Sequence, residues 1–429
     1  MSFFRLLGEN RNYRYTWIGQ VVSEVGDHFN NIAVFALAMK YGEPGPVLSA
    51  VLIARGLPML IAGPLAGVIL DRFDRKRVMI ASDLIRGFVA ALFVLCENQR
   101  EPWLLYVLSA VLMFASPFFT AGRAAILPVI ATRQELHIAN SVTITTQWTN
   151  TAIGAFLGGM SVHGLGYGVS FFANAMSFFF SAWCIQHLRV PQGFRAHRHE
   201  VIHEGNVLKP WHDYADGLRY LLRTPLILAI ALIGVGWALG GGAAQILFSL
   251  FGEVVYHRGA QGIGVIWATA GLGLVCGGFI AHWIGKRLSF EQYKWTVPIC
   301  YTIHGAGYVL FSQIHHFGWA LIFIAVSRMG TAVSSILNNA QILRHVPDAY
   351  RGRVFSTMET ITWSMMMVSL MVAGVASLTY TPRQIGTVVG ALSFVTVAVW
   401  AWANATGRLP EPPLEGVPPE EVEIHGEPA

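Results

Sequence analysis

Four polar residues share one face of the first apolar stretch, which covers residues 15–39. Glu24, Asp27, His28 and Asn31 are spaced i, i+3, i+4 and i+7, the pattern of a single helical face. A carboxylate among apolar residues takes up a proton readily, and a nearby cation favours its release. The stretch is therefore predicted to carry a proton-binding face.

A similar polar stripe occurs in the apolar stretch 317–341. It consists of Arg328, Thr331, Ser335 and Asn338. An ionisable group in a membrane span usually faces a cavity or a partner, which we expect of Arg328 and of Asn338 on the same face. Gln245, from another apolar stretch, is a further candidate for such a cavity, and Glu359, nearer the cytoplasm, is a candidate for a gate. Simple packing between helices is the alternative role for these stripes.

One motif suggests a different chemistry. His199-Glu200-Val201-Ile202-His203 matches the HExxH pattern, which on a helix could bind zinc and supply a general base. A catalytic zinc site needs three protein ligands and a dry cavity, and no third ligand stands at helical spacing here. We interpret the segment as a solvated loop, with adventitious metal binding as the alternative, and expect no resident metal and no cofactor.

The composition indicates where these residues work. Among the 429 residues, 54% are hydrophobic and 12% are charged, and the mean hydropathy is +0.50. An ordinary soluble protein has about 25% charged residues, which cover its surface. The chain is therefore predicted to be an all-α integral membrane protein. Its basic balance fits loops beside anionic lipid and not binding to nucleic acid.

Long segments without charges predict how often the chain crosses the membrane. One span needs roughly 20 apolar residues. The segments accommodate about twelve helices, and one long segment is expected to divide near residues 163–168. With the N-terminus inside, 22 of the 29 Lys and Arg residues fall in inside connections and 4 in outside ones. The positive-inside rule then predicts that both termini are cytoplasmic.

Depth within the membrane suggests a partner for Asp27. At about 1.5 Å per residue, Asp27 and Arg55 both lie about 18 Å from the inner edge of a 30 Å hydrocarbon core. We predict an Asp27–Arg55 pair whose carboxylate exchanges a proton between two conformations, with a permanent structural ion pair as the alternative. Asp83 and Arg86, at i and i+3 in the third stretch, are expected to form a structural pair.

The chain divides near its middle. Residues 188–224 form the longest polar connection, which we predict to be a cytoplasmic loop, and about six spans lie on each side. The segments 67–77 and 278–287 echo one another 211 residues apart, which indicates a duplication. We predict two pseudo-symmetric six-helix bundles, 1–187 and 225–406. The acidic, proline-rich tail, 407–429, is expected to be disordered.

The first copy of the echo carries a family resemblance. Gly67-x-x-x-Asp71-Arg72-x-x-Arg75-Lys76-Arg77 resembles the signature loop of the major facilitator superfamily. Three further segments resemble its macrolide and siderophore exporter branch: Asn12-Tyr13-Arg14-x-x-Trp17-Ile18-Gly19-Gln20, Glu135-Leu136-x-x-Ala139-Asn140-Ser141 and Pro347-Asp348-x-x-Arg351-Gly352-Arg353-Val354-Phe355. The stretch 154–159 resembles the glycine-rich segment of exporters in this family, but it has Ala155 where that segment usually has proline.

The resemblance implies both a function and a latch. Gly67, Asp71, Arg72, Arg75 and Lys76 would close the cytoplasmic side, with Asp71 at a helix N-terminus and Gly67 allowing two helices to approach. The implied protein is a drug:proton antiporter of the bacterial plasma (inner) membrane, and not an enzyme. By alternating access, it would export a hydrophobic or amphipathic small molecule as a monomer in the lipid bilayer. The alternatives are a lipid or lysolipid flippase of the same fold and a transport-inactive membrane scaffold.

Overall fold

The computed structural model describes residues 3–99, 101–189 and 210–412. Its first part consists of helices that run along the chain in this order: α1 (Phe3–Glu9), α2 (Arg11–Ala38), α3 (Pro44–Arg72), α4 (Arg75–Leu92), the short 3₁₀ segment η1 (Phe93–Asn98), α5 (Trp103–Ile130), α6 (Arg133–Leu165) and α7 (Tyr167–Gln186). Apart from the short α1, these helices coincide with apolar stretches of the sequence. The predicted division near 163–168 is confirmed, because Gly166 separates α6 from α7 with a positive φ of 87° that favours glycine.

The second part is also helical. It consists of α8 (Pro210–Arg223), α9 (Pro225–Leu250), the π-helical turn η2 (Phe251–Val255), α10 (Gly259–Gly285), α11 (Phe290–Gln313), α12 (Phe317–His345), α13 (Asp348–Ala376) and α14 (Pro382–Ala405). Helix α8 lies within the predicted central connection, so that connection is partly helical. The HExxH segment and most of the predicted tail lie outside the described residues.

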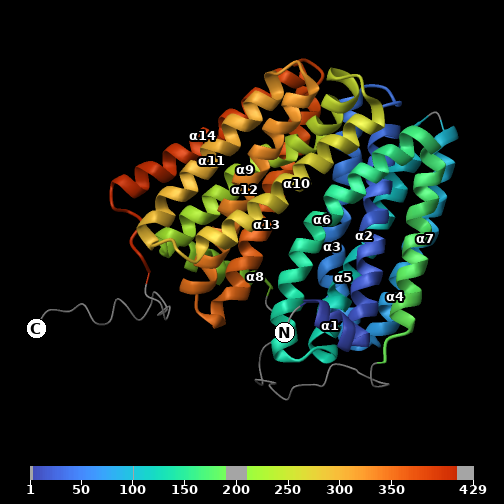
Figure 1. The fold of residues 1–429 in the computed structure, drawn as a ribbon, viewed down its shortest axis with the longest axis horizontal. Helices are drawn as coiled ribbons and strands as arrows, with labels where there is room; N and C mark the ends of the chain where they lie inside the picture. Colours follow the sequence, from blue (N-terminus) through green and yellow to red (C-terminus); the bar gives the residue numbers. More distant parts are fainter. Residues whose placement is uncertain (1–2, 100, 190–209, 413–429) are drawn as a thin grey trace, which may run out of the picture. The chain divides into compact units, whose positions relative to one another are not determined.

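Nine helices of the described chain are long and apolar enough to cross a membrane. Three other long helices, α2, α6 and α11, contain 28, 33 and 24 residues and carry more polar side chains. Figure 1 shows this all-helical architecture, in which the described residues form no strand. An all-α membrane protein is therefore confirmed. Helices suit this setting because they satisfy their own backbone hydrogen bonds where no water is available.

The chain forms two compact units. Of the described residues, unit 1 comprises those within 3–189, 246–272 and 374–379, and unit 2 comprises 210–245, 273–373 and 380–412. In unit 1, α2 packs against both α6 and α7, while α3 packs against α5 and α4 against α5 and α7 (Figure 1). In unit 2, α11 packs against both α12 and α14. The polar residues of α2 are therefore held between neighbouring helices.

Candidate functional site

The polar face of α2 begins one turn earlier than predicted. Gln20 is buried and donates a 2.6 Å hydrogen bond to the Glu24 carboxylate, four residues along the same helix. Asn150 of α6, also buried, donates to the other Glu24 oxygen at 2.7 Å. Arg123 of α5 donates to the side-chain oxygen of Gln20. Three helices of unit 1 are thus joined through the Glu24 carboxylate and its neighbours.

Sequence patterns missed three members of this network. Gln20 lies at i−4 from Glu24, so its place on the same face could have been recognised from spacing alone. Arg123 was expected in a connection, but α5 continues to Ile130 and carries it inside the helix. Asn150 lies on α6, and nothing in the sequence links it to Glu24.

Arg55 has a different partner from the one predicted. Its Nη2 atom donates to the side-chain oxygen of Asn31, one helical turn beyond Asp27, and in the described chain it forms no ion pair with Asp27. The predicted Asp27–Arg55 ion pair is therefore not formed in this conformation. Depth counted from the ends of a stretch is imprecise by about one turn of 5.4 Å, because the helices extend beyond the apolar stretches. The second nitrogen of this guanidinium, Nη1, is buried without a hydrogen-bond partner.

Asp27 lies between the Glu24 network and the Arg55–Asn31 contact. Its side chain is half-buried and accepts no hydrogen bond from the residues that the structure places. It is attracted by the positive charges of Arg86 and Arg55 and repelled by Glu24 and other acidic groups. The Asp27 carboxylate is thus near cations but is not fixed by a hydrogen bond from any described residue. The Glu24 carboxylate, in contrast, is fixed by hydrogen bonds from two side-chain amides.

The predicted structural pair is confirmed. Arg86 donates to Asp83 within α4, and both side chains are almost fully buried. The Arg86 guanidinium also stacks near the rings of Phe119 and Phe178, at 4.7 and 4.4 Å from their centroids. Such cation–π contacts stabilise a cation away from water. The pair forms part of the packing among α4, α5 and α7.

The glycine-rich segment of α6 brings that helix against the polar face. A methyl group at Gly154 would lie 2.8 Å from the Cβ atom of His28, and one at Gly158 would lie 3.0 Å from the Cα atom of Phe29. Real Cβ atoms do not approach so closely without movement of a neighbour. The two glycines therefore fix how near α6 comes to the site on α2.

The predicted stripe of α12 proves to be largely an interhelical contact. Thr331 hydrogen-bonds with His304 of α11 at 3.0 Å, and Asn338 accepts a 2.8 Å hydrogen bond from the hydroxyl of Tyr293. The Arg328 guanidinium is buried 5.9 Å from the centre of the Tyr308 ring. Ser335 is exposed, and the buried Ser334 takes its place beside Asn338.

Sequence reasoning missed His304, whose signal was an ionisable side chain in an apolar stretch. Its Nδ1 atom lies 2.8 Å from the Ser327 hydroxyl and 3.0 Å from that of Thr331. Elsewhere in unit 2, Gln245 donates to the sulfur of Met366 at 3.2 Å. Glu359 is exposed. In unit 2, His304 thus connects Ser327 with Thr331, while Gln245 and Asn338 have partners of their own.

The loop between α3 and α4 holds other helix ends in place. Lys76 donates to the carbonyl oxygens of Gln186 and Leu188, at 2.8 and 3.0 Å, where α7 ends. Arg75 donates to the carbonyl oxygen of Ala125 at 3.0 Å. A cation is favourable at the C-terminal end of a helix dipole. Two residues of the predicted latch therefore fasten this loop to α5 and α7 within unit 1.

Two details of the loop differ from those expected for the latch. Asp74, and not Asp71, accepts the capping hydrogen bond at the start of α4, from the Arg77 backbone at 2.9 Å. Asp71 and Arg72 are exposed in the last turn of α3. A methyl group at Gly67 would meet no described atom within 4 Å, so the close helix contact expected there is not present in this conformation.

Comparisons with known proteins agree with the resemblance of the loop. Residues 16–369 match the model of the Major Facilitator Superfamily. The chain is 27% identical over 365 residues to YfiS, an uncharacterised MFS-type transporter of Bacillus subtilis (strain 168), covering 80% of this chain and 81% of that protein. It is 28% identical to the enterobactin exporter EntS of Citrobacter koseri, covering 70% and 69% of the two chains.

Two further likenesses complete this picture. Macrolide efflux protein A of Streptococcus pyogenes is 21% identical, covering 86% of this chain and 88% of its own. The solved structure of a bacterial homologue of the iron transporter ferroportin, in an inward-facing state, matches the fold with a TM-score of 0.66. It covers 94% of this chain and all of its own at 16% identity, so it supports the fold alone.

Proposed function

Because this chain belongs to the Major Facilitator Superfamily, a family of membrane transporters, we propose that it exports a hydrophobic or amphipathic small molecule in exchange for protons. Two six-helix bundles would open a central site alternately to each side of the plasma membrane. Twelve spans would leave both termini in the cytoplasm, where most of the Lys and Arg residues then lie. The names of the exporter relatives support efflux as the direction.

One observation carries the proton-coupling part of the proposal. Ionisable groups in a membrane are costly, and they usually face a cavity or a partner that gives them a function. The α2 face holds two carboxylates between Arg123 and Arg55, and only Glu24 is fixed by hydrogen bonds. We assign proton uptake to Asp27, because its half-buried carboxylate has no fixed partner and can respond to a neighbouring cation.

Arg55 would sense the charge of Asp27. When Asp27 is protonated, Arg55 donates to Asn31, as it does here. When Asp27 loses its proton, the unpartnered Nη1 atom of Arg55 can pair with the carboxylate one turn away. A cation that moves between these two partners would convert a protonation event into a shift of α3 relative to α2. This exchange supplies two states that substrate and proton can bias.

The test is transport by a neutral, isosteric variant. We expect cells that produce the wild-type protein to accumulate less of some compounds in a panel of macrolides, catecholate siderophores and amphipathic dyes. The effect should disappear with a protonophore and in Asp27→Asn. In inverted vesicles, substrate addition should release protons with the wild type and not with this variant. The matched control is Asp74→Asn, since asparagine also caps helices well and Asp74 lies outside the site.

Three results would count against the proposal. Intact proton-coupled efflux by Asp27→Asn would remove Asp27 from the mechanism. A purified protein that moves fluorescent lysolipids between leaflets, with no effect on any compound in the panel, would replace efflux by lipid flipping as the function. A protein without either activity would favour a membrane scaffold.

A further inference from the structure

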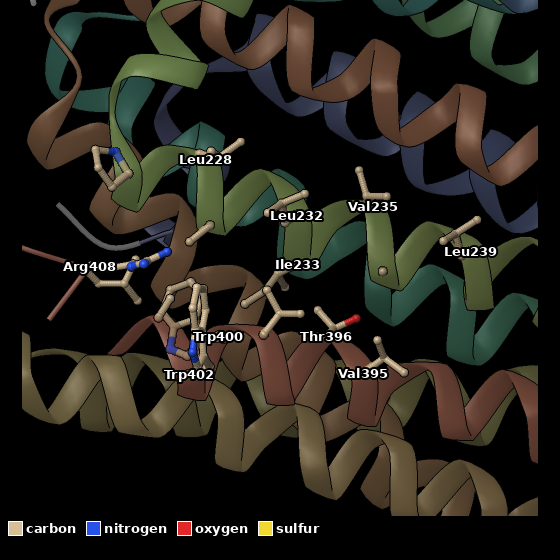
Figure 2. Close-up of a pocket in the computed structure, with 16 residues that line it drawn as sticks. Leu228, Leu232, Ile233, Val235, Leu239, Val395, Thr396, Trp400, Trp402 and Arg408 are labelled. Carbon is tan, nitrogen blue, oxygen red and sulfur yellow. The ribbon is translucent and has the colours of Figure 1, made fainter. Parts of the chain in front are cut away.

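An apolar groove runs between α9 and α14 in unit 2, and none of the residues that line it takes part in the polar contacts described above. Its volume is about 410 Å³, within the range of about 300–1,000 Å³ that is typical of ligand pockets. Figure 2 shows the residues that line it: Leu228, Leu232 and Leu239 come from α9, Val395 and Trp402 come from α14, and Arg408 lies at one end. The hydroxyl of Thr396 is satisfied within its own helix, so the walls of this α9–α14 groove offer little but hydrocarbon.

Helices α9 and α14 are antiparallel where they cross. A methyl group at Gly236 would overlap the side chain of Thr396, and one at Gly240 would contact Val389. Moving forward along α9 thus means moving backward along α14. Pro225 precedes the Gly236 crossing by 11 residues, and Arg408 follows the Thr396 crossing by 12, so the start of α9 and Arg408 lie at the same end of the groove.

In the first half of the chain, α2 and α7 cross in the same way as α9 and α14, but aromatic side chains fill the space that corresponds to the groove. Gly26 of α2 packs against Ser177 of α7 as Gly236 packs against Thr396. Trp183 and Trp402 both lie six residues beyond the hydroxyl residue of their crossing. In the first half, Tyr15 stands 11 residues before its glycine. Its ring stacks with that of His187 and meets that of Trp183 edge to face, at 5.8 and 6.1 Å between ring centres.

Pro225 occupies the corresponding position in the second half, again 11 residues before the glycine. A pyrrolidine ring cannot fill the volume of a tyrosine side chain. The groove below Trp402 is therefore the space that an aromatic cluster occupies in the first half. Leu232, Val395 and Val399 border it and are 46%, 62% and 47% exposed, so on spanning helices they lie where hydrocarbon can reach them.

A cation marks the end of the groove. The Arg408 guanidinium lies 4.4 Å from the centre of the Trp402 ring and, among the described residues, forms no ion pair. Glu411, the acidic residue closest to it in sequence, instead pairs with Arg344 and His345. The buried indole of Trp400 donates to the carbonyl oxygen of Lys294 at 2.8 Å and is not available to a ligand. The guanidinium is thus the charged group that the groove presents.

We propose that the α9–α14 groove binds one anionic phospholipid, with an acyl chain between the helices and the phosphate on Arg408. From Pro225 to Leu239 the groove extends about 21 Å at 1.5 Å per residue, comparable to the roughly 15 Å depth of one leaflet. An arginine binds phosphate through two parallel hydrogen bonds. The assignment to the cytoplasmic leaflet rests on the orientation given under the proposed function, whereas the site itself does not depend on export.

Lipid binding to the purified, full-length protein tests the proposal. Native mass spectrometry in detergent should be carried out with added phosphatidylglycerol or phosphatidylcholine. The protein should bind one phosphatidylglycerol molecule at a lower lipid concentration than it needs to bind further phosphatidylglycerol molecules or any phosphatidylcholine. Arg408→Gln should weaken this binding about fivefold, which corresponds to about 1 kcal/mol for one basic residue beside an anionic lipid. Val399→Trp should remove the tight site, because it fills the groove as Tyr15 fills the equivalent space.

Each variant has a matched control. Arg287 lies just beyond the end of α10, 4.8 Å from the centre of the Trp283 ring, and does not line the α9–α14 groove, so Arg287→Gln should leave binding unchanged. Val388, 61% exposed on α14 and outside the groove, provides Val388→Trp as the control for bulk. Phosphatidylglycerol with a photoreactive acyl chain should label peptides from α9 and α14.

Four results would overturn the proposal. Two concern the lipid itself: wild-type binding by both Arg408→Gln and Val399→Trp, and equal affinity for phosphatidylcholine. Displacement of the lipid by an exported compound would make the groove part of the substrate route, and tighter lipid binding after removal of residues 413–429 would identify the acidic tail as the occupant. Efflux that persists in Val399→Trp would leave the proposed export intact whichever way lipid binding is decided.

Discussion

Asn150 of α6 donates a 2.7 Å hydrogen bond to the Glu24 carboxylate of α2, and so joins residues 126 positions apart in the sequence. The other Glu24 oxygen accepts a hydrogen bond from Gln20, so with Asn150 both oxygens of the carboxylate have a donor. The contact fixes the position of Glu24 while Asp27, three residues along, has no such support.

Removing that amide should destabilise the protein. Asn150→Ala leaves one oxygen of a partly buried carboxylate without its donor, and we expect the free energy of unfolding to fall by about 1–2 kcal/mol. Thermal unfolding in detergent would measure the change. Asn339→Ala, at an exposed position of α12, should have almost no effect. Equal melting temperatures for the two variants would show that the contact adds nothing to stability.

The approach of α6 to α2 should tolerate no added methyl group. Gly158→Ala would place a Cβ atom 3.0 Å from the Phe29 backbone, and overpacking of this kind costs about 1–3 kcal/mol. Gly63→Ala, where nothing lies within 4 Å, should be neutral or stabilising because alanine favours a helix. Unfolding by a denaturing detergent would rank the two variants. A stable Gly158→Ala protein would mean that the helices can separate at no cost.

The buried Asp83–Arg86 pair should respond differently to single and double substitution. Arg86→Met leaves a buried carboxylate without its cation, and breaking a buried pair in this way costs about 3–5 kcal/mol. Asp83→Leu combined with Arg86→Met removes both charges and should recover most of that loss. Expression level and melting temperature of the three proteins would measure the coupling. A double variant less stable than the single one would contradict a purely structural pair.

Lys76 should stabilise the end of α7. Lys76→Met removes one hydrogen bond to the last carbonyl group of that helix, another to the Leu188 carbonyl just beyond it, and a favourable charge at the helix C-terminus, which together are worth about 1 kcal/mol. Hydrogen exchange should then speed up in residues 184–188 before other parts of α7. Arg77→Met, an exposed neighbour, should leave exchange unchanged. Faster exchange throughout unit 1 would instead point to a general loss of packing.

Local periodicity allowed much of the protein to be predicted from its sequence. Runs without charge gave the helices and the break at Gly166, since apolar length alone decides whether a segment can span a bilayer. Residues three or four apart on one helix are neighbours wherever the helix lies, which is why the Asp83–Arg86 pair was predictable.

Contacts between helices depended on the tertiary structure. The choice of Asn31 over Asp27 by Arg55, the hydrogen bond from Arg123 to Gln20 and the pairing of Thr331 with His304 all depend on the rotation and axial offset of two helices. One turn of about 5.4 Å is enough to exchange one partner for the next. The sequence by itself determined which faces are polar, and only the packing of the helices decided which side chains meet.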